Sequence, residues 1–180
     1  TFASLFWATA LKAKADRATE VIFICDGARW IWNLVEQYFP QAFQIVDWFH
    51  AEERLEQVAE DAFSKAEAKE WLDEILTELW YGNTPFVIDA CEKLASRSVL
   101  ASQALTYFRH NAHRMQYDLF RRNGYLIGSG TIESACKQIV SQRLKRPGAQ
   151  WNLHGAVLTA KARAARLSGD WQHLCSLRDH

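Results

Sequence analysis

Two acidic residues, Asp26 and Glu133, stand in sequence surroundings that suit a ligand of a divalent cation. Asp26 directly follows the apolar run 21–25 and precedes Gly27, which has no side chain and so lets a ligand approach the backbone closely. Glu133 comes shortly after Gly-Ser-Gly at 128–130, in the expected first turn of a helix, where the helix dipole favours a negative charge. Hard cations such as Mg²⁺ and Mn²⁺ select oxygen ligands, so the pair indicates a metal site if the fold brings the carboxylates together.

Each acid also has a purely structural explanation. An Asp-Gly pair after a strand commonly forms a turn, which accounts for Asp26 without any metal. Ser129 or Thr131 can cap the following helix, with Glu133 as its first-turn acid. Taken one at a time, the two acids leave the structural and the catalytic interpretations open.

A second acid, Asp47, ends the next apolar run, and an imidazole follows three residues later at His50. Such a pair can bind a metal, orient a neighbouring carboxylate, or form a buried hydrogen bond that fixes the start of the next helix. We interpret Asp47 and His50 as a buried structural pair.

Positive charge gathers in the second half of the chain. Residues 1–90 hold seven Lys and Arg against sixteen Asp and Glu, a balance of −9, whereas residues 91–180 hold fourteen against five, a balance of +9. Positive charge beside an acidic metal site suits a phosphodiester substrate, because phosphate contacts supply most of the nonspecific affinity for DNA. The predicted DNA-binding residues are Arg114, Arg121, Arg122, Lys137, Arg143, Lys145, Arg146 and, by stacking on a base, Trp151.

The charges have alternative explanations. The two halves of the chain can neutralise each other across an internal interface, and a basic helix face can simply be solvated. A tryptophan at the start of a helix, such as Trp151, is commonly a packing residue.

The elements that must position these residues follow from the pattern of apolar residues. The run 21–25 and the run 43–47 are expected strands, and the segment 29–38 between them is an expected helix. A strand-helix-strand unit implies parallel strands, and ligand sites in parallel sheets lie at the carboxyl ends of the strands. Asp26 and Asp47 both stand at such ends.

The rest of the chain is predicted to be mainly helical. Apolar residues at helical spacing predict one long helix or two over 50–80, further helices over 85–96 and 98–122, a short extended segment over 125–127, and helices over 131–145 and 151–167. The fold class is therefore α/β and mostly helical. The predicted division is an α/β core over 1–50, a helical insertion over 51–122, and a C-terminal region over 123–180 with a catalytic helix and a basic helical tail.

The composition of the chain argues against a secreted or membrane-spanning protein. Four widely spaced cysteines without a secretory signal predict reduced thiols in an intracellular, cytoplasmic protein, and no apolar run is long enough to cross a membrane. The chain begins at Thr1 rather than at Met, which suggests a fragment.

Three segments together resemble the insertion-sequence transposases of the ISKra type, relatives of the Mutator-like DDE transposases. They are Asp26–Trp32 leading through Phe39-Pro40 to Ile45–Ala51, then Gly124–Lys137, and then Arg143–Trp151 followed by Gly155-Ala156. Their order and spacing match the family over nearly the whole chain. The resemblance implies a ribonuclease H-like fold with a helical insertion, with the second catalytic acid at Asp26 and the third at Glu133. It makes Asp47 and His50 the match for a motif that supports the site.

The same resemblance implies a chemistry and partners. Two Mg²⁺ or Mn²⁺ ions, roughly 4 Å apart, would promote DNA cleavage and strand transfer by a homodimer that pairs two transposon ends. The family's first catalytic Asp and its first three strands have no counterpart here, because Asp16 stands in a polar, helix-like stretch. We therefore expect this segment alone to be inactive, whereas the complete protein, bound to DNA at the nucleoid, would carry the activity.

Two other functional readings remain open from the sequence. The chain can be a catalytically inactive DNA-binding or regulatory remnant of a transposase. It can also be a helical protein-interaction module whose oppositely charged halves pair with each other or with a second copy.

Overall fold

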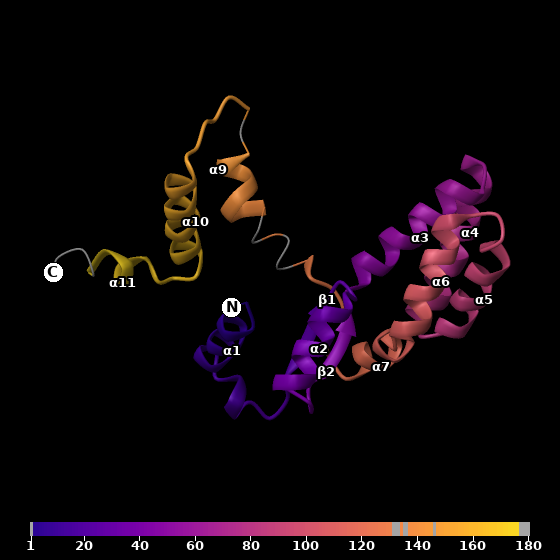
Figure 1. Ribbon diagram of the computed structural model, residues 1–180, viewed down its shortest axis with the longest axis horizontal. Coiled ribbons are helices and arrows are strands. Elements are labelled where there is room, and N and C mark those ends of the chain that lie inside the picture. Colours follow the sequence, from indigo (N-terminus) through magenta and orange to yellow (C-terminus); the bar gives the residue numbers. More distant parts are fainter. Residues whose placement is uncertain (1, 131–133, 135–136, 146, 177–180) are drawn as a thin grey trace. The chain divides into compact units, whose positions relative to one another are not determined.

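The computed structural model describes residues 2–130, 134, 137–145 and 147–176. They belong to two compact units, one ending at Ser129 and the other beginning at Gly130, and each is described by itself. The protein is mostly helical with a small two-stranded parallel sheet, so the predicted class of a largely helical α/β protein is confirmed (Figure 1). None of the described helices is both long enough and apolar enough to span a membrane.

The first unit contains the predicted strand-helix-strand motif, made of β1 (Ile22–Cys25), α2 (Arg29–Tyr38) and β2 (Phe43–Val46). The strands are parallel, with Ile22 opposite Phe43 and Cys25 opposite Val46. Each strand is one residue shorter than predicted, because Val21 lies outside β1 and Asp47 is the cap of the next helix. The two acids Asp26 and Asp47 therefore follow the last paired residues of adjacent parallel strands.

A helix that the sequence analysis did not anticipate, α1 (Phe2–Lys12), precedes the sheet and is followed by the 3₁₀ turn η1 (Ala15–Arg17). Its aromatic residues hold it on the strand-helix-strand motif. The ring of Phe6 lies 5.6 Å from that of Phe23, and Trp7 stacks on Tyr38 at 5.4 Å between ring centroids. Aromatic packing, rather than a polar and apolar face, fixes this helix.

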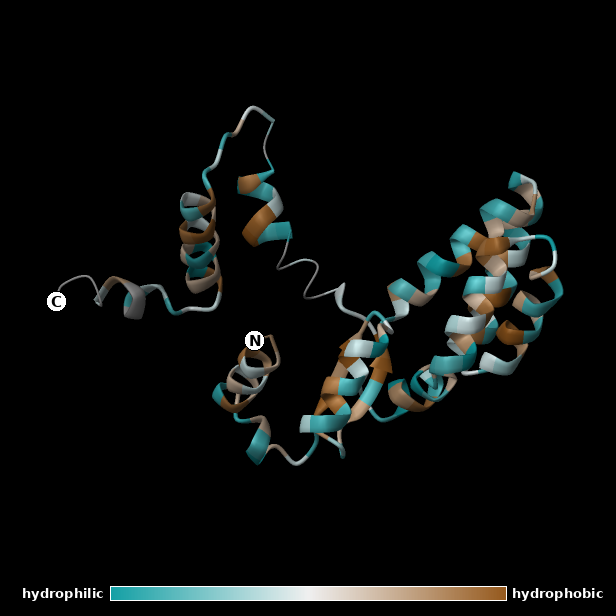
Figure 2. Ribbon diagram, in the orientation of Figure 1, coloured by the Kyte–Doolittle hydropathy of each residue, from teal (hydrophilic) through white to brown (hydrophobic). Residues whose placement is uncertain are grey.

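Most of the remaining first unit is a helical bundle. Its members are α3 (Trp48–Ala62), α4 (Lys65–Trp80), α5 (Thr84–Leu94) and α6 (Val99–Asn111). Each helix packs on the next, and α6 packs back on α3 (Figure 1). Figure 2 shows the strands mostly in brown, whereas α3 and α4 alternate between teal and brown, as expected for helices with one face in a core.

Local signals explain where these helices begin. Asp47 and Ser98 cap α3 and α6 by accepting hydrogen bonds from the backbone N–H groups of Phe49 and Ala101. Ser64 and Glu67 form a reciprocal capping box that separates α4 from α3. The predicted segment 50–80 is thus two helices.

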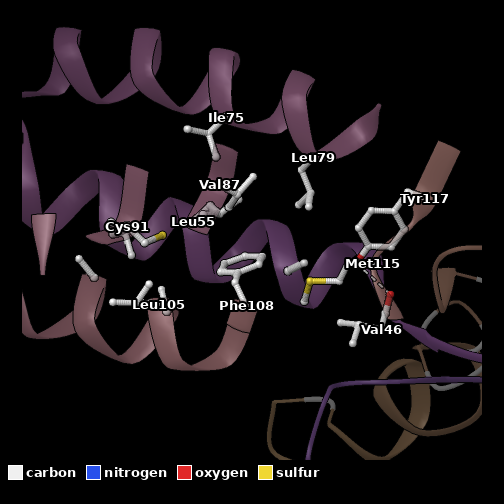
Figure 3. Close-up of a cluster of buried hydrophobic side chains, with 14 of the residues drawn as sticks. Val46, Leu55, Ile75, Leu79, Val87, Cys91, Leu105, Phe108, Met115 and Tyr117 are labelled. Atoms are coloured by element: carbon white, nitrogen blue, oxygen red, sulfur yellow. Dashed lines mark hydrogen bonds between the residues drawn. The ribbon is translucent and has the colours of Figure 1, made fainter. Parts of the chain in front are cut away.

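The core of the bundle is formed by apolar side chains from every one of these helices. Figure 3 shows Leu55, Ile75, Val87 and Phe108 pointing toward one another from α3, α4, α5 and α6. All of them are at most 1% exposed. Their burial, rather than helix propensity, supplies the main stabilisation of the bundle.

The prediction of one continuous helix over 98–122 is wrong, because the helix is interrupted near its middle. It is divided into α6, the 3₁₀ turn η2 (Ala112–Arg114) and α7 (Tyr117–Arg122). The division allows Arg114 and Tyr117 to turn toward the sheet, where Arg114 Nε donates to the side chain of Gln44 and Tyr117 donates to the backbone oxygen of Val46. These tertiary contacts replace the continuous helix.

The second unit consists of short helical pieces. They are η3 (Lys137–Ser141), α9 (Gln142–Leu144), α10 (Leu153–Leu167) and α11 (Trp171–Ser176). The element η3 is a π-helical turn, and Arg163 of α10 donates hydrogen bonds to the backbone oxygens of Gln138 and Ile139 within it. The described part of the predicted helix 131–145 is therefore helical with a π-turn, and it ends at Leu144.

Candidate functional site

Asp26 lies on the surface at the carboxyl end of β1. Its Oδ1 accepts a hydrogen bond from the N–H of Ala28 at 2.9 Å, and Gly27 has a φ of 89°, so the expected Asp-Gly turn is present. Among the described residues, no hydrogen bond reaches Oδ2. The turn thus occupies one carboxylate oxygen and leaves the other without a hydrogen bond from the described residues, which makes the turn and the ligand interpretations compatible.

The backbone at Asp26 is fixed by a residue that sequence reasoning missed. The hydroxyl of Tyr107, on α6, donates to the carbonyl oxygen of Asp26 at 3.0 Å. Burial raises the pKa of Tyr107 to about 12, so its hydroxyl keeps its proton at neutral pH. Nothing in the sequence around Tyr107 signals this contact, because the two residues are 81 positions apart.

Asp47 is buried, with 1% of its surface exposed. Its Oδ1 accepts from the N–H of Phe49 at 3.0 Å and its Oδ2 accepts from the N–H of Ser129 at 3.2 Å. His50 Nδ1 lies 3.4 Å from Asp47 Oδ2, within ion-pair distance, but it makes no hydrogen bond with the described residues, and 42% of its side chain is exposed. The pair is therefore a close contact in which only the aspartate is buried.

The two strand-end acids share one edge of the sheet. The N–H of Asp47 donates to the carbonyl of Cys25 at 2.8 Å, which continues the strand pairing up to the residue before Asp26. Burial, together with the negative charges of Asp26 and Asp47, raises the pKa of the Cys25 thiol to about 11. Both carboxylates therefore raise the pKa of the same thiol.

The segment Ile127–Ser129 is held at this same edge. The N–H of Trp48 donates to the carbonyl of Ile127 at 2.8 Å, and the Ser129 N–H bond to Asp47 follows two residues later. A side chain at Gly128 would come within 2.9 Å of the ring of Phe49, so a glycine is needed for the close approach. The predicted extended segment 125–127 does not form a strand, but its end docks on the start of α3.

Glu133, the other predicted metal ligand, lies outside the described residues, as does Arg146. Within the described ranges, no group of three or more His, Cys, Asp or Glu residues is arranged to hold a metal ion. The convergence of Asp26 and Glu133 remains a prediction.

The predicted basic residues of the first unit lie in different environments. Arg114 is 8% exposed and donates to Glu36 at 3.1 Å as well as to Gln44, so its placement favours a structural role. Arg121 lies 3.8 Å above the ring of Trp80, and its guanidinium donates to the carbonyl of that residue. Arg122 is exposed and pairs with Asp118.

In the second unit, the predicted DNA-binding residues that the structure describes are exposed. Lys137, Arg143 and Lys145 are exposed, and Trp151 is 39% exposed just before α10. Residues 130–180 carry eight Lys and Arg against three Asp and Glu, a balance of +5. The sequence of this unit therefore carries a net positive charge.

Comparisons with protein-family models, with curated proteins and with solved structures find no match for this chain.

Proposed function

We propose that this chain is the C-terminal part of the catalytic domain of a DDE-type DNA transposase. Asp26 and Glu133 are two of the three acidic ligands of its divalent-metal centre, and the strand-helix-strand motif is part of a ribonuclease H-like core. The proposal rests on the sequence motifs and on the geometry of the strand ends. In the complete protein the centre cleaves DNA and joins the cut end to a target.

One observation carries the proposal, namely the docking of Ile127–Ser129 on the strand end beside Asp26. Glu133 follows Ser129 by four residues, and four residues of fully extended chain span at most about 14 Å. If the segment docked elsewhere, this reach would not keep Glu133 near Asp26. The docking therefore supports a site assembled from Asp26 and Glu133, although the two residues are 107 positions apart (133 − 26 = 107).

The two strand-end aspartates differ in a way that supports different roles. Asp26 is exposed and has a carboxylate oxygen that accepts no hydrogen bond from the described residues, as a metal ligand requires. Asp47 is buried, and each of its oxygens accepts a backbone hydrogen bond. We assign Asp26 to the metal and Asp47 to positioning, with His50 beside it.

The residues present fit a hard divalent cation because their available donors are carboxylate oxygens. When bound, two Mg²⁺ or Mn²⁺ ions supply charge neutralisation and activation of the attacking hydroxyl in phosphoryl transfer. The chain's own contributions are the Tyr107 hydrogen bond, which fixes the backbone of Asp26, and the Asp47 anchor of Ser129. The exposed basic residues of the second unit are assigned to the DNA backbone.

Manganese titration of the ¹⁵N-labelled chain tests the shared centre directly. Paramagnetic Mn²⁺ should broaden the amide signals of Gly27 and Ser134 at the same low concentration, because each is the neighbour of one proposed ligand. The variant Asp26→Asn should abolish both effects, whereas Asp89→Asn, an exposed acid on α5, should change neither. Broadening near only one of the two acids would contradict a common site.

Catalysis is tested in a longer protein that also supplies the upstream strand with the first Asp. Glu133→Gln should abolish DNA cleavage while DNA binding stays within a few-fold. Retained cleavage would remove Glu133 from the site. DNA affinity that falls with salt but is accompanied by no manganese effect would instead favour the DNA-binding remnant, and the absence of both would favour the interaction module.

A further inference from the structure

A cavity of about 550 Å³ lies in the first unit beside the Gly27 turn, between α2, α3 and α6. Its walls include Arg29 and Trp32 of α2, Arg54 of α3, and Tyr107 of α6. We call it the arginine cavity. Its volume falls within the range of small-molecule sites and accommodates a ligand of the size of a nucleotide.

The arginine cavity carries an excess of positive charge. Arg29, Arg54 and Arg114 line it, against one lining acid, Glu36. Arg114 is neutralised by Glu36, since its Nη2 lies 3.1 Å from the carboxylate. Arg29 and Arg54 form no ion pair with the described residues, so both guanidinium groups are available to an anion.

Trp32, in the wall of the cavity, carries a buried hydrogen-bond donor without an acceptor among the described residues. Trp32 is only 3% exposed, and its indole Nε1 has no hydrogen-bond partner among the described residues. Buried donors in folded proteins are nearly always paired, so an orphaned one requires an explanation. An acceptor oxygen brought to this N–H by a bound ligand would provide it.

The wall is held in place before any ligand arrives. The guanidinium of Arg54 lies 4.2 Å above the ring of Tyr107, whose hydroxyl is bonded to the Asp26 carbonyl. Arg114 in turn lies 4.8 Å above the ring of Trp32. Because stacked arginines lose less freedom on binding, such a wall favours recognition of an anion.

We propose that the arginine cavity binds a phosphate group. Arg29 and Arg54 supply the charge, and the indole N–H of Trp32 donates a hydrogen bond to a phosphate oxygen. The amide side chains of Asn33 and Gln103, also in the walls, suit the remainder of a nucleotide. This site is separate from the proposed metal ligands and does not depend on them. The phosphate can belong to a DNA strand, to a free nucleotide or to inorganic phosphate.

The indole N–H signal of Trp32 in ¹H–¹⁵N spectra of the full chain gives a readout specific to the cavity, and its loss in Trp32→Phe identifies it. Titrations with inorganic phosphate, thymidine monophosphate and a short single-stranded oligothymidylate distinguish the sources. We expect the chemical shift of this signal to change and to reach saturation with at least one of these probes. The probe that binds with the highest affinity identifies the source of the phosphate. Binding elsewhere, including the basic second unit, would leave this signal in place.

Variants of the arginines complete the test. Arg54→Ala should weaken the response of the Trp32 signal roughly tenfold, because it removes a charge-assisted contact. Arg97→Ala is the matched control, since Arg97 also lies over an aromatic ring, that of Phe63, but away from the cavity; it should change the affinity by less than about twofold. Both arginines are exposed, so neither change should unfold the chain. A Trp32 signal unmoved by all three probes, or an affinity unaffected by Arg54→Ala, would overturn the proposal.

Discussion

Replacing Asp47 with alanine tests whether the strand end holds the Ile127–Ser129 segment in place. The Asp47 carboxylate accepts hydrogen bonds from the backbone N–H groups of Phe49 and Ser129 and is almost fully buried. Alanine retains the backbone and removes both acceptors. The change therefore takes away the cap of α3 and the anchor of the docked segment in a single step.

The expected loss follows from these two contacts. Loss of an N-cap costs about 1 kcal/mol, and up to about 2 kcal/mol. A buried N–H left without an acceptor costs about 1 to 3 kcal/mol; because Ser129 is half-buried, we take the lower part of that range. Asp47→Ala should thus lower the free energy of unfolding by about 2 to 4 kcal/mol. Asp47→Asn, which keeps one acceptor, should cost about half as much.

Urea unfolding followed by tryptophan fluorescence measures this loss. Six of the eight tryptophans precede Ser129, so the signal reports mainly on the first unit. Asp26→Asn is the control, because that side chain is exposed and an asparagine oxygen can still accept from Ala28; it should change stability by less than about 0.5 kcal/mol. Amide exchange at Ser129 should also accelerate in Asp47→Ala. A stability close to that of the unmodified chain, with unchanged exchange at Ser129, would refute the anchor.

Two further predictions concern the turn and the thiols. Gly27→Ala places a Cβ 2.6 Å from the ring of Tyr107 at a φ of 89°, and should lower the free energy of unfolding in urea by about 1 to 3 kcal/mol. Gly124→Ala is the control, because Gly124 also has a positive φ but nothing lies within 4 Å of the added Cβ, so this change should cost less. Equal costs would argue against the contact with the Tyr107 ring. Burial raises the pKa of Cys91 to about 12, which leaves about one thiolate in ten thousand at pH 8. Iodoacetamide followed by peptide mass spectrometry should therefore modify Cys91 at least a hundredfold more slowly than the exposed Cys175, with the difference lost in urea; equal rates in the folded chain would contradict its burial.

The strand-helix-strand motif could be predicted because its signals are local. Two short β-branched and aromatic runs flank a segment that ends at Phe39-Pro40, and the structure places β1, α2 and β2 within one residue of the predicted bounds. The break after α6 could not be predicted in this way. It depends on Arg114 and Tyr117 reaching Gln44 and Val46, which are 70 and 71 positions away, and no local pattern encodes such contacts.

The candidate site could also be predicted only in the part that depends on local sequence signals. Asp26 and Asp47 could be placed at one sheet edge from the order of strands alone, since parallel strands end at the same edge. The partners that fix them could not, because Tyr107 and Ser129 reach the strand ends from distant parts of the chain. The arginine cavity was missed for the same reason: Arg29 and Arg54 stand in segments whose sequences read as ordinary helix surface.

The helical region also positions the ends of the two strands. A sheet of two short strands leaves backbone carbonyls at its edge that must find donors elsewhere. Two tyrosines from the helical region supply them, Tyr107 for the carbonyl of Asp26 and Tyr117 for that of Val46. Figure 3 shows the second of these hydrogen bonds at the end of the bundle core, so the same packing that stabilises the helices also sets the position of the strand ends. Any activity that depends on Asp26 must then depend on the bundle as well.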